Sequence, residues 1–360
     1  AVVPEKIYNP VAVHSIQSPL VWAGDIFLEG INTIERPLFI QPGTRVLLAE
    51  QASLIIKNRL LALGSKDQPI QFVAHHSQQK PWGAVVLMGP LANESVIEHC
   101  EFARGSGLKA SLYEYTAMLS IHDVQQLVVS DCLFRDNDLV DDMVHVVYSH
   151  VDFQRNHFVN AFADALDIDI STANISDSVF ESSGNDAIDL MSSEVSVLGS
   201  IFRSNDDKGI SVGEGSQLLA LNNVLRDNII GIQVKDRSSA LLFNQSLFGN
   251  QTALAAFKKN WRYGQGGLLV LSKSVLAGNK VNMDIQKQSK AFLFDSAIEG
   301  DFAGKRIRSW LVDTQQGQAQ VKGLLAQDIW NIPELSGILT KTSEPLFKQH
   351  YSELRGAHDL

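Results

Sequence analysis

Aspartates and one histidine recur at a single spacing in the middle of the chain, and such groups can serve as acids, bases or cation ligands. The spacing gives two columns: His145, Asp167 and Asp189 in one, and Asp142, Asp164, Asp186 and Lys208 in the other. Carboxylates that stack closely repel each other unless a cation, a basic residue or a shared proton compensates. A histidine beside them is a candidate proton acceptor, because its unperturbed pKa is about 6.5.

The elements that would position these columns are short strands that recur with the same period. A small residue stands at Ala165, Ala187, Gly209, Gly231 and Ala253, and an alternating segment such as ADALDIDI follows each one. Alternation places the aliphatic side chains on one face and the polar side chains on the other. One such strand cannot bury its apolar face alone, but stacked repeats can. Stacked strands would lie about 4.8 Å apart, which makes successive aspartates near neighbours.

A second pattern supports a coil rather than a leucine-rich repeat, whose LxxLxL spacing is missing. An asparagine follows an apolar residue by three positions, as in Phe134/Asn137, Phe202/Asn205, Leu225/Asn228, Leu247/Asn250 and Leu276/Asn279. Stacked asparagines satisfy one another's hydrogen bonds at a turn. The sequence therefore predicts an all-β solenoid, a single-stranded right-handed parallel β-helix with coils of about 22 residues.

The domain organisation follows from where this rhythm holds. We expect one β-helix over residues 1–300, interrupted by a loop at about 104–118, and a partly helical segment over 301–360 that caps the open end. The net charge of -10 and a pI of about 5.5 argue against nucleic acid as a partner. No apolar run is long enough for a membrane span. Cys100 and Cys132 occupy similar local frames and are either bridged or two buried thiols.

Several roles stay open for the two columns. His145, Asp167, Asp189 and Lys208 are the candidate catalytic residues, with His145 or Lys208 as the base. Lys208 is equally well explained by an ion pair with an aspartate. Turn capping is the alternative for Asp164 and Asp186, which stand where a turn enters a strand. Asp167 and Asp189 fall inside a strand, where aspartate has poor propensity, and this favours a functional role.

Further residues are candidates for binding. The predicted substrate-binding residues are Asp164, Asp186, Lys235, Arg262, Tyr263, Tyr113 and Tyr115. The tyrosines and the neighbouring Trp261 suit stacking on sugar rings, although core packing explains Trp261 equally well. The predicted metal ligands are Asp164, Asp167, Asp186 and Asp189, and the metal would be Ca²⁺ because carboxylate oxygens are its preferred ligands. No other cofactor is expected.

The repeats resemble the pectin-lyase-like superfamily of right-handed β-helices over roughly residues 24–300. That resemblance implies cleavage or epimerisation of a polysaccharide on the outside of one parallel sheet, and a secreted or periplasmic bacterial protein. The stretch from Asp164 to Ser216 also resembles β-helix modules attached to spore-coat-H-type kinases. The length resembles biofilm-matrix polysaccharide lyases of the RbmB type. The Asn-Thr-Asp and His-Gly pairs of polygalacturonases and the Asp-Pro-His-Asp motif of alginate epimerases are missing.

Three functions are compatible with these residues. A lyase that cleaves a uronate-containing exopolysaccharide by β-elimination needs a base, an acid and a positive charge near the substrate carboxylate. A glycoside hydrolase would use paired aspartates, and stacked Asp167 and Asp189 suit the separation of about 5 to 5.5 Å in a retaining enzyme. A non-catalytic module that binds glycan or protein is the third. The resemblance favours the lyase.

Overall fold

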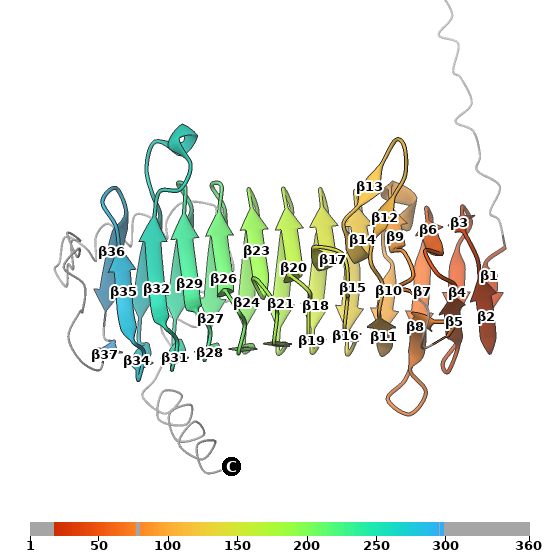
Figure 1. The fold of residues 1–360 in the computed structure, drawn as a ribbon, viewed down its shortest axis with the longest axis horizontal. Coiled ribbons are helices and arrows are strands. Elements are labelled where there is room, and N and C mark those ends of the chain that lie inside the picture. The colour runs from red at the N-terminus through yellow and green to blue at the C-terminus, as the bar shows by residue number, and fades with distance from the viewer. Residues whose placement is uncertain (1–17, 77–79, 295, 299–360) are drawn as a thin grey trace, which may run out of the picture.

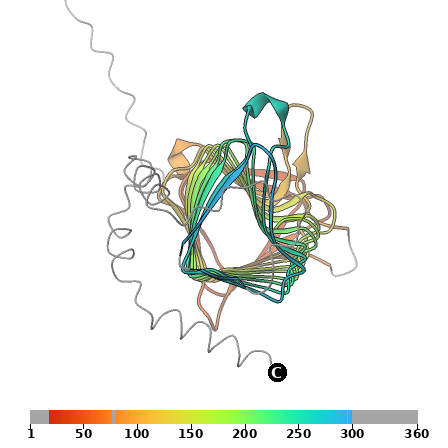
Figure 2. The same cartoon turned by 90° about the vertical axis from the view of Figure 1, so that its left-hand side faces the viewer.

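The computed structural model describes residues 18–76, 80–294 and 296–298, which form an elongated three-sided coil (Figures 1 and 2). Each turn of the coil contributes one strand to each of three long parallel sheets. We call these sheets A, B and C, and their strands are given below. In chain order a strand of sheet C is followed by one of sheet A and then by one of sheet B. The predicted all-β parallel solenoid is thereby confirmed.

The strands of each sheet follow one another along the coil axis. Sheet A contains β1 (Leu20–Trp22), β4 (Leu38–Ile40), β7 (Leu60–Leu63), β10 (Val96–Glu98), β15 (Leu127–Ser130), β18 (His150–Gln154), β21 (Thr172–Ser176), β24 (Glu194–Leu198), β27 (Gln217–Leu221), β30 (Ser239–Phe243), β33 (Leu268–Ser272) and β36 (Lys290–Phe294). Sheet B contains β2 (Asp25–Leu28), β5 (Arg45–Leu48), β8 (Ile70–Ala74), β11 (Cys100–Ala103), β16 (Leu133–Arg135), β19 (His157–Val159), β22 (Val179–Glu181), β25 (Ile201–Arg203), β28 (Val224–Arg226), β31 (Ser246–Phe248), β34 (Val275–Ala277) and β37 (Ala297–Ile298). Sheet C contains β3 (Ile31–Ile34), β6 (Ser53–Ile56), β9 (Val85–Met88), β14 (Ala117–His122), β17 (Asp142–Val147), β20 (Asp164–Asp169), β23 (Ile188–Met191), β26 (Lys208–Gly213), β29 (Ile230–Lys235), β32 (Thr252–Phe257) and β35 (Val281–Ile285).

The register of sheet C agrees with the predicted period. Leu166 pairs with Ile188, which pairs with Ile210 on the next strand. The candidate residues follow the same register, so that Asp167 lies between His145 and Asp189. These polar side chains face outward because the alternate aliphatic residues fill the core.

Repeated side chains fill the interior of the coil. On sheet B the rings of six phenylalanines stack with centroids 4.5–5.1 Å apart: Phe72, Phe102, Phe134, Phe158, Phe180 and Phe202. The predicted asparagine ladder lies in the turns from sheet B to sheet C, where Asn228 donates to Asn250 over 3.0 Å and accepts from Asn205 over 2.8 Å. Stacking one residue type per coil lets every coil satisfy the polar groups of the next.

The corner between sheets A and B has a constant shape from His99 onward. Only His99 separates β10 from β11, and two residues separate the strands from β15 onward. The first corner residue has a positive φ, as in Asp131 (54°), Arg155 (53°) and Asp177 (49°). The second points inward, and it is a cysteine at Cys100 and Cys132. Both cysteines are free thiols in adjacent coils, and the Cys100 amide donates to the Cys132 sulfur over 3.4 Å.

Two segments depart from the coil near sheet C. Residues 104–116, which join β11 to β14, form a hairpin of β12 (Leu108–Lys109) and β13 (Glu114–Tyr115). Leu108 and Tyr115 pack on the outer face of sheet C against Ile55 and Val86. The chain also contains two short 3-10 helices within the described residues, η1 (Pro90–Ala92) and η2 (Trp261–Tyr263). The predicted cap over 301–360 lies outside the residues that the structure describes.

Candidate functional site

The outer face of sheet C brings His145 together with three carboxylates. Its Nε2 lies 3.3 Å from Asp169 Oδ2 and 3.6 Å from Asp167 Oδ2, both on the neighbouring strand β20. Its Nδ1 lies 3.9 Å from Asp142 Oδ2 on its own strand. The imidazole is 14% exposed, so part of it remains accessible from outside the coil. This geometry suits proton transfer.

Thr116 holds the other side of the imidazole. Its hydroxyl lies 3.0 Å from His145 Nδ1 and donates to Asp142 Oδ2 over 2.9 Å. A hydroxyl has one proton, so when it donates to an ionised Asp142 it accepts from Nδ1–H. Nε2 then carries no proton and lies 3.6 Å from Asp167 Oδ2, which can donate to it when protonated; in the other tautomer Nε2–H donates to Asp169 Oδ2 over 3.3 Å. Thr116 and Asp142 therefore orient His145 as a base.

Burial and mutual repulsion keep protons on several of these carboxyl groups. Burial raises the pKa of Asp167 to about 9, and the charges of Asp142, Asp169, Asp189 and Asp164 add to this effect. Burial also raises the pKa of Asp142 to about 7, although His145 opposes that rise. At neutral pH Asp167 therefore carries a proton, and it lies beside a histidine that can accept one.

The column that contains Asp164 and Asp186 has a structural duty as well. Asp164 Oδ1 accepts from the Asp186 amide over 2.7 Å and from Asn185 Nδ2 over 2.8 Å. Asp186 Oδ1 in turn accepts from the Lys208 amide over 3.1 Å. Burial raises the pKa of Asp164 to about 6 and that of Asp186 to about 7. These bonds cap the turns that enter sheet C, which is the alternative that the sequence left open.

Lys208 is held in ion pairs. Its Nζ lies 3.2 Å from Asp186 Oδ1 and also contacts Asp207. Burial alone would lower the pKa of Lys208, but the two carboxylates raise it. A lysine in this state is an ion-pair partner, and the geometry assigns it no proton-accepting role.

Lys235 reaches back along the groove toward Asp189. Its Nζ lies 4.0 Å from Asp189 Oδ1 and 3.3 Å from Ser211 Oγ, and its side chain is only 7% exposed. Its stem crosses Gly213, where an added Cβ would come within 2.4 Å of Lys235 Cε. The absence of a side chain at Gly213 thus permits this path. A cation here stands close to the candidate aspartates.

The predicted aromatic residues lie at the two ends of this face. At the N-terminal end the Tyr115 ring contacts His122 edge-on at 5.1 Å, and His122 contacts His145 at 5.7 Å. Tyr113 is more exposed and lies 5.5 Å from Tyr115. At the other end, beyond Phe257, η2 carries Arg262 and Tyr263. The structure does not bring these two groups together.

Metal binding was predicted at Asp164, Asp167, Asp186 and Asp189, but the described residues cluster differently. The groups whose ligand atoms lie within 4.8 Å of one another are Asp142/His145/Asp167 and Glu98/His99/Asp131. The first offers two carboxylates and one nitrogen, and Asp142 already accepts a bond from Thr116. Calcium takes six to eight oxygen ligands, so this donor set fits Ca²⁺ poorly. A Ca²⁺ requirement stays a prediction.

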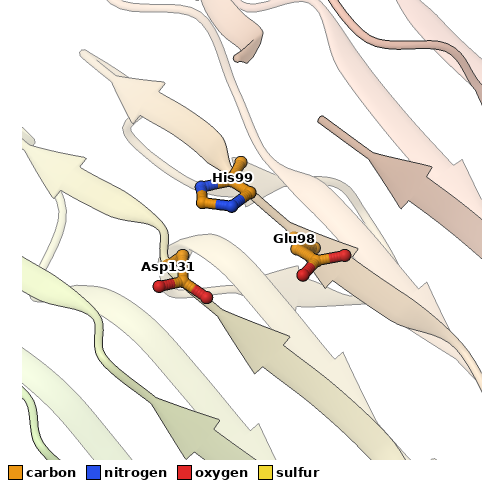
Figure 3. A group of neighbouring side chains, drawn as sticks. All are labelled: Glu98, His99 and Asp131. Carbon is orange, nitrogen blue, oxygen red and sulfur yellow. The ribbon is translucent and has the colours of Figure 1, made fainter. Parts of the chain in front are cut away.

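The second cluster lies at the corner of sheets A and B, away from sheet C. Figure 3 shows the side chains of Glu98, His99 and Asp131, which come from two neighbouring coils. Arg155 binds Asp131 through two bonds of 2.6 and 2.9 Å, which lower the pKa of that carboxyl. The guanidinium already neutralises this carboxylate, so the cluster has little charge left to offer a metal ion.

Sequence reasoning missed Thr116, His122 and the cluster of Glu98, His99 and Asp131. Burial, helped by the charge of His145, lowers the pKa of His122 to about 4, which leaves its ring neutral beside His145. Aligning the segments around Cys100 and Cys132 would have placed Asp131 over His99. Thr116 and His122 lie in a coil of irregular length, where counting by 22 does not apply.

The comparisons agree with this architecture. Residues 119–284 match the family described as the right handed beta helix region. The chain has the fold of a right-handed parallel β-helix. Among solved structures, a mutant of the periplasmic alginate epimerase AlgG aligns with a TM-score of 0.50 and 12% identity, over 77% of this chain and 73% of that chain. No curated protein matches the sequence.

Two further solved structures align less well. The A-module of the mannuronan C-5 epimerase AlgE4 from Azotobacter vinelandii has a TM-score of 0.39 and 12% identity, over 80% of this chain and 91% of that chain. An alginate lyase from a Paenibacillus species has a TM-score of 0.36 and 12% identity, over 72% of this chain and 89% of that chain. No helix among the described residues is long and apolar enough to cross a membrane.

Proposed function

We propose that this protein is a polysaccharide-degrading enzyme that cleaves a uronate-containing exopolysaccharide by β-elimination on the outer face of sheet C. The observation that carries the proposal is the contact of 3.6 Å between His145 Nε2 and Asp167 Oδ2. Elimination removes a proton and protonates a leaving oxygen on adjacent carbon atoms, so its acid and base must lie close together. The relatedness in fold to an alginate epimerase supports a polyuronate as the substrate.

His145 and Asp167 together account for both proton transfers of the elimination. His145 Nε2 takes the proton from the carbon next to the uronate carboxyl group, and that electron pair forms the new double bond. The bond to the glycosidic oxygen breaks, and Asp167 gives its proton to that oxygen. A proton shift from His145 to Asp167 then restores the starting state. Lys235, whose Nζ lies 4.0 Å from Asp189, is the candidate cation for the substrate carboxylate, and Ca²⁺ remains the alternative source of positive charge.

A secreted or periplasmic location and a role in a biofilm matrix belong to the same proposal. The periplasmic location of the epimerase with the same fold supports the first. The resemblance in length to RbmB-type lyases supports the second. Incubation of a biofilm matrix with the protein, followed by analysis of the released oligosaccharides, tests this role.

Glycoside hydrolysis is the second candidate, and the protonated Asp167 favours it. A carboxyl group with a pKa near 9 is a general acid at neutral pH. Asp189 lies in register on the next strand, about 4.8 Å away along the axis, which is close to the separation in retaining enzymes.

The test is a panel of acidic and neutral polysaccharides in which the absorbance of unsaturated uronates and new reducing ends are measured together. A rise in both signals identifies elimination. New reducing ends without a rise in absorbance identify hydrolysis. If neither signal appears, the protein is a binding module. Replacement His145→Gln should lower the elimination rate by about 10²- to 10⁴-fold. The matched control is His150→Gln, a histidine on sheet A that bonds to Thr172 and should leave the rate unchanged.

A further inference from the structure

A cleft of about 710 Å³ lies at the corner between sheets C and A, toward the C-terminal end of the coil. Its polar lining consists mainly of Glu214, Gln217, Arg237, Tyr263, Gln265 and Lys290. Its nearest coil begins at β26, three strands along sheet C from β17, which carries His145. Three strand spacings amount to about 14 Å along the axis, so this cleft lies apart from His145.

Two cations line the cleft without a carboxylate partner. Neither Arg237 nor Lys290 has a salt bridge to any acidic group of the part of the chain that the structure describes. Glu214 is the one acidic side chain among the lining residues named for this cleft. The carbonyl oxygen of the Gln217 side chain is buried there and has no hydrogen-bond partner among the described residues. Two cations and a single carboxylate therefore line the same space.

An insertion in one coil builds the wall of the cleft. Leu254 pairs with Met283, and this coil is longer than the one before it, in which Ile232 pairs with Leu254. The added residues include η2, and Tyr263 and Gln265 of this loop reach the cleft. The wall therefore comes from a segment that the regular coils do not have.

The inserted loop is fixed to the coil at both ends. Asp236 Oδ1 holds its start by accepting from the amides of Lys259 and Asn260, each over 2.7 Å. At its end the Arg237 amide donates to the Gly266 carbonyl over 3.2 Å. These bonds tie the loop to the residues that follow β29.

A close approach of two backbones also anchors the returning chain. A Cβ on Gly267 would come within 2.2 Å of the Val234 carbonyl oxygen, so the chain returns against the sheet at a distance that only glycine allows. The wall is therefore held in one place, and a site on it is preorganised.

We propose that this cleft is an accessory subsite that binds a carboxylate-bearing oligosaccharide, with Arg237 and Lys290 as the anion-binding residues. Glutamine amides and the Tyr263 ring suit the hydroxyls and the faces of sugar rings. Glu214 opposes a doubly charged phosphate more than a singly charged carboxylate. That the ligand is the enzyme's own polyuronate rests on the proposed function, whereas the anion-binding site itself does not.

The experiment is calorimetric titration of the full chain carrying His145→Gln, so that the probe is not cleaved. The probes are tetragalacturonate and an alginate tetrasaccharide, with neutral cellotetraose as the uncharged reference. We expect the acidic probes to bind and the affinity to fall as salt is added. The double replacement of Arg237→Gln and Lys290→Gln should weaken binding at least tenfold, whereas Lys287→Gln, an exposed lysine outside the cleft lining, should change it less than twofold.

Each outcome decides the inference. Equal affinity in the double replacement would place the bound probe elsewhere and overturn it, as would the lack of any binding by either acidic probe. Arg237→Lys, which keeps the charge, should recover part of the lost affinity if the protein binds through that charge. Binding is measured apart from turnover, so an inactive enzyme that binds through Arg237 would refute the proposed function and leave this subsite standing. A cleaving enzyme without such binding would do the reverse.

Discussion

The asparagine ladder and the outer face of sheet C both stack one polar side chain per coil, but the stacked groups differ in charge. In the ladder each amide donates to one neighbour and accepts from the other, so repetition satisfies the buried asparagine amides. On sheet C the stacked groups are carboxylates, which can accept but not donate unless they hold a proton. Stacking one side chain per coil therefore stabilises the fold in the asparagine ladder and brings like charges together on sheet C. Groups whose pKa values are perturbed by such charges are typical of functional sites.

The largest effect on stability should come from the phenylalanine stack on sheet B, which is the apolar counterpart of the asparagine ladder. Replacement Phe158→Ala removes a ring that stacks at 4.8 Å on Phe134 and at 4.6 Å on Phe180, and should lower the free energy of unfolding by about 3–5 kcal/mol. Chemical denaturation measures this. Phe162→Ala is the control, because that ring is 60% exposed, and a similar loss there would show that stacking is not the cause.

A smaller loss is expected from the asparagine ladder itself. Asn228→Ala removes the oxygen that accepts from the Asn205 backbone and side chain, and one of the two donors to Asn250 Oδ1, which should cost about 2–3 kcal/mol in unfolding free energy. Asn160→Ala, which removes a single bond to Asp136 at the surface, is the matched control. If both variants unfold at the same denaturant concentration, the ladder does not stabilise the coil as described.

Replacing a stacked carboxylate of sheet C should raise the free energy of unfolding, whereas replacing a stacked phenylalanine or asparagine lowers it. The folded-state pKa of Asp167 is raised to about 9, so the native state binds more protons than the unfolded state between about pH 4 and 9. Stability therefore falls as the pH rises through that window. Asp167→Asn should remove part of this slope and raise the unfolding free energy at pH 8 by about 1–3 kcal/mol.

Thermal unfolding of wild type and variant at pH 5 and pH 8 measures that difference. Asp177→Asn, an exposed aspartate at the corner of sheets A and B, should leave the slope unchanged. An unchanged slope in Asp167→Asn would show that the stacked carboxylates do not repel one another in the folded protein.

The smallest effect concerns the orientation of the base. Thr116→Val removes the hydroxyl that joins His145 Nδ1 to Asp142, and should lower turnover about tenfold and shift the pH profile. Thr116→Ser keeps the hydroxyl and should restore both. A purely structural role for Thr116 would change stability without moving the pH profile.

The sequence predicted the parts of the molecule that repeat regularly. Between β17 and β32 the steps are constant, so counting by 22 placed Asp167 between His145 and Asp189 and put Lys235 on the same face. The coil that runs from Ala117 to its partner Asp142 is longer, and the hairpin of β12 and β13 precedes it. Counting in steps of 22 residues therefore did not place Thr116 and His122 beside His145. The proton on Asp167 depends on burial, which no spacing in the sequence expresses.

The two-residue corner between sheets A and B has a consequence for how this chain can change. Longer segments occur at the corners that flank sheet C, in residues 104–116 and 258–267, whereas the A–B corner keeps its two residues from β15 onward. A longer loop at a corner that flanks sheet C leaves the strand register intact, because the next A–B corner again has two residues and the strands after it pair as before. The coil is therefore a scaffold for loop grafting, in which specificity can be exchanged along one edge of the groove without redesigning the core.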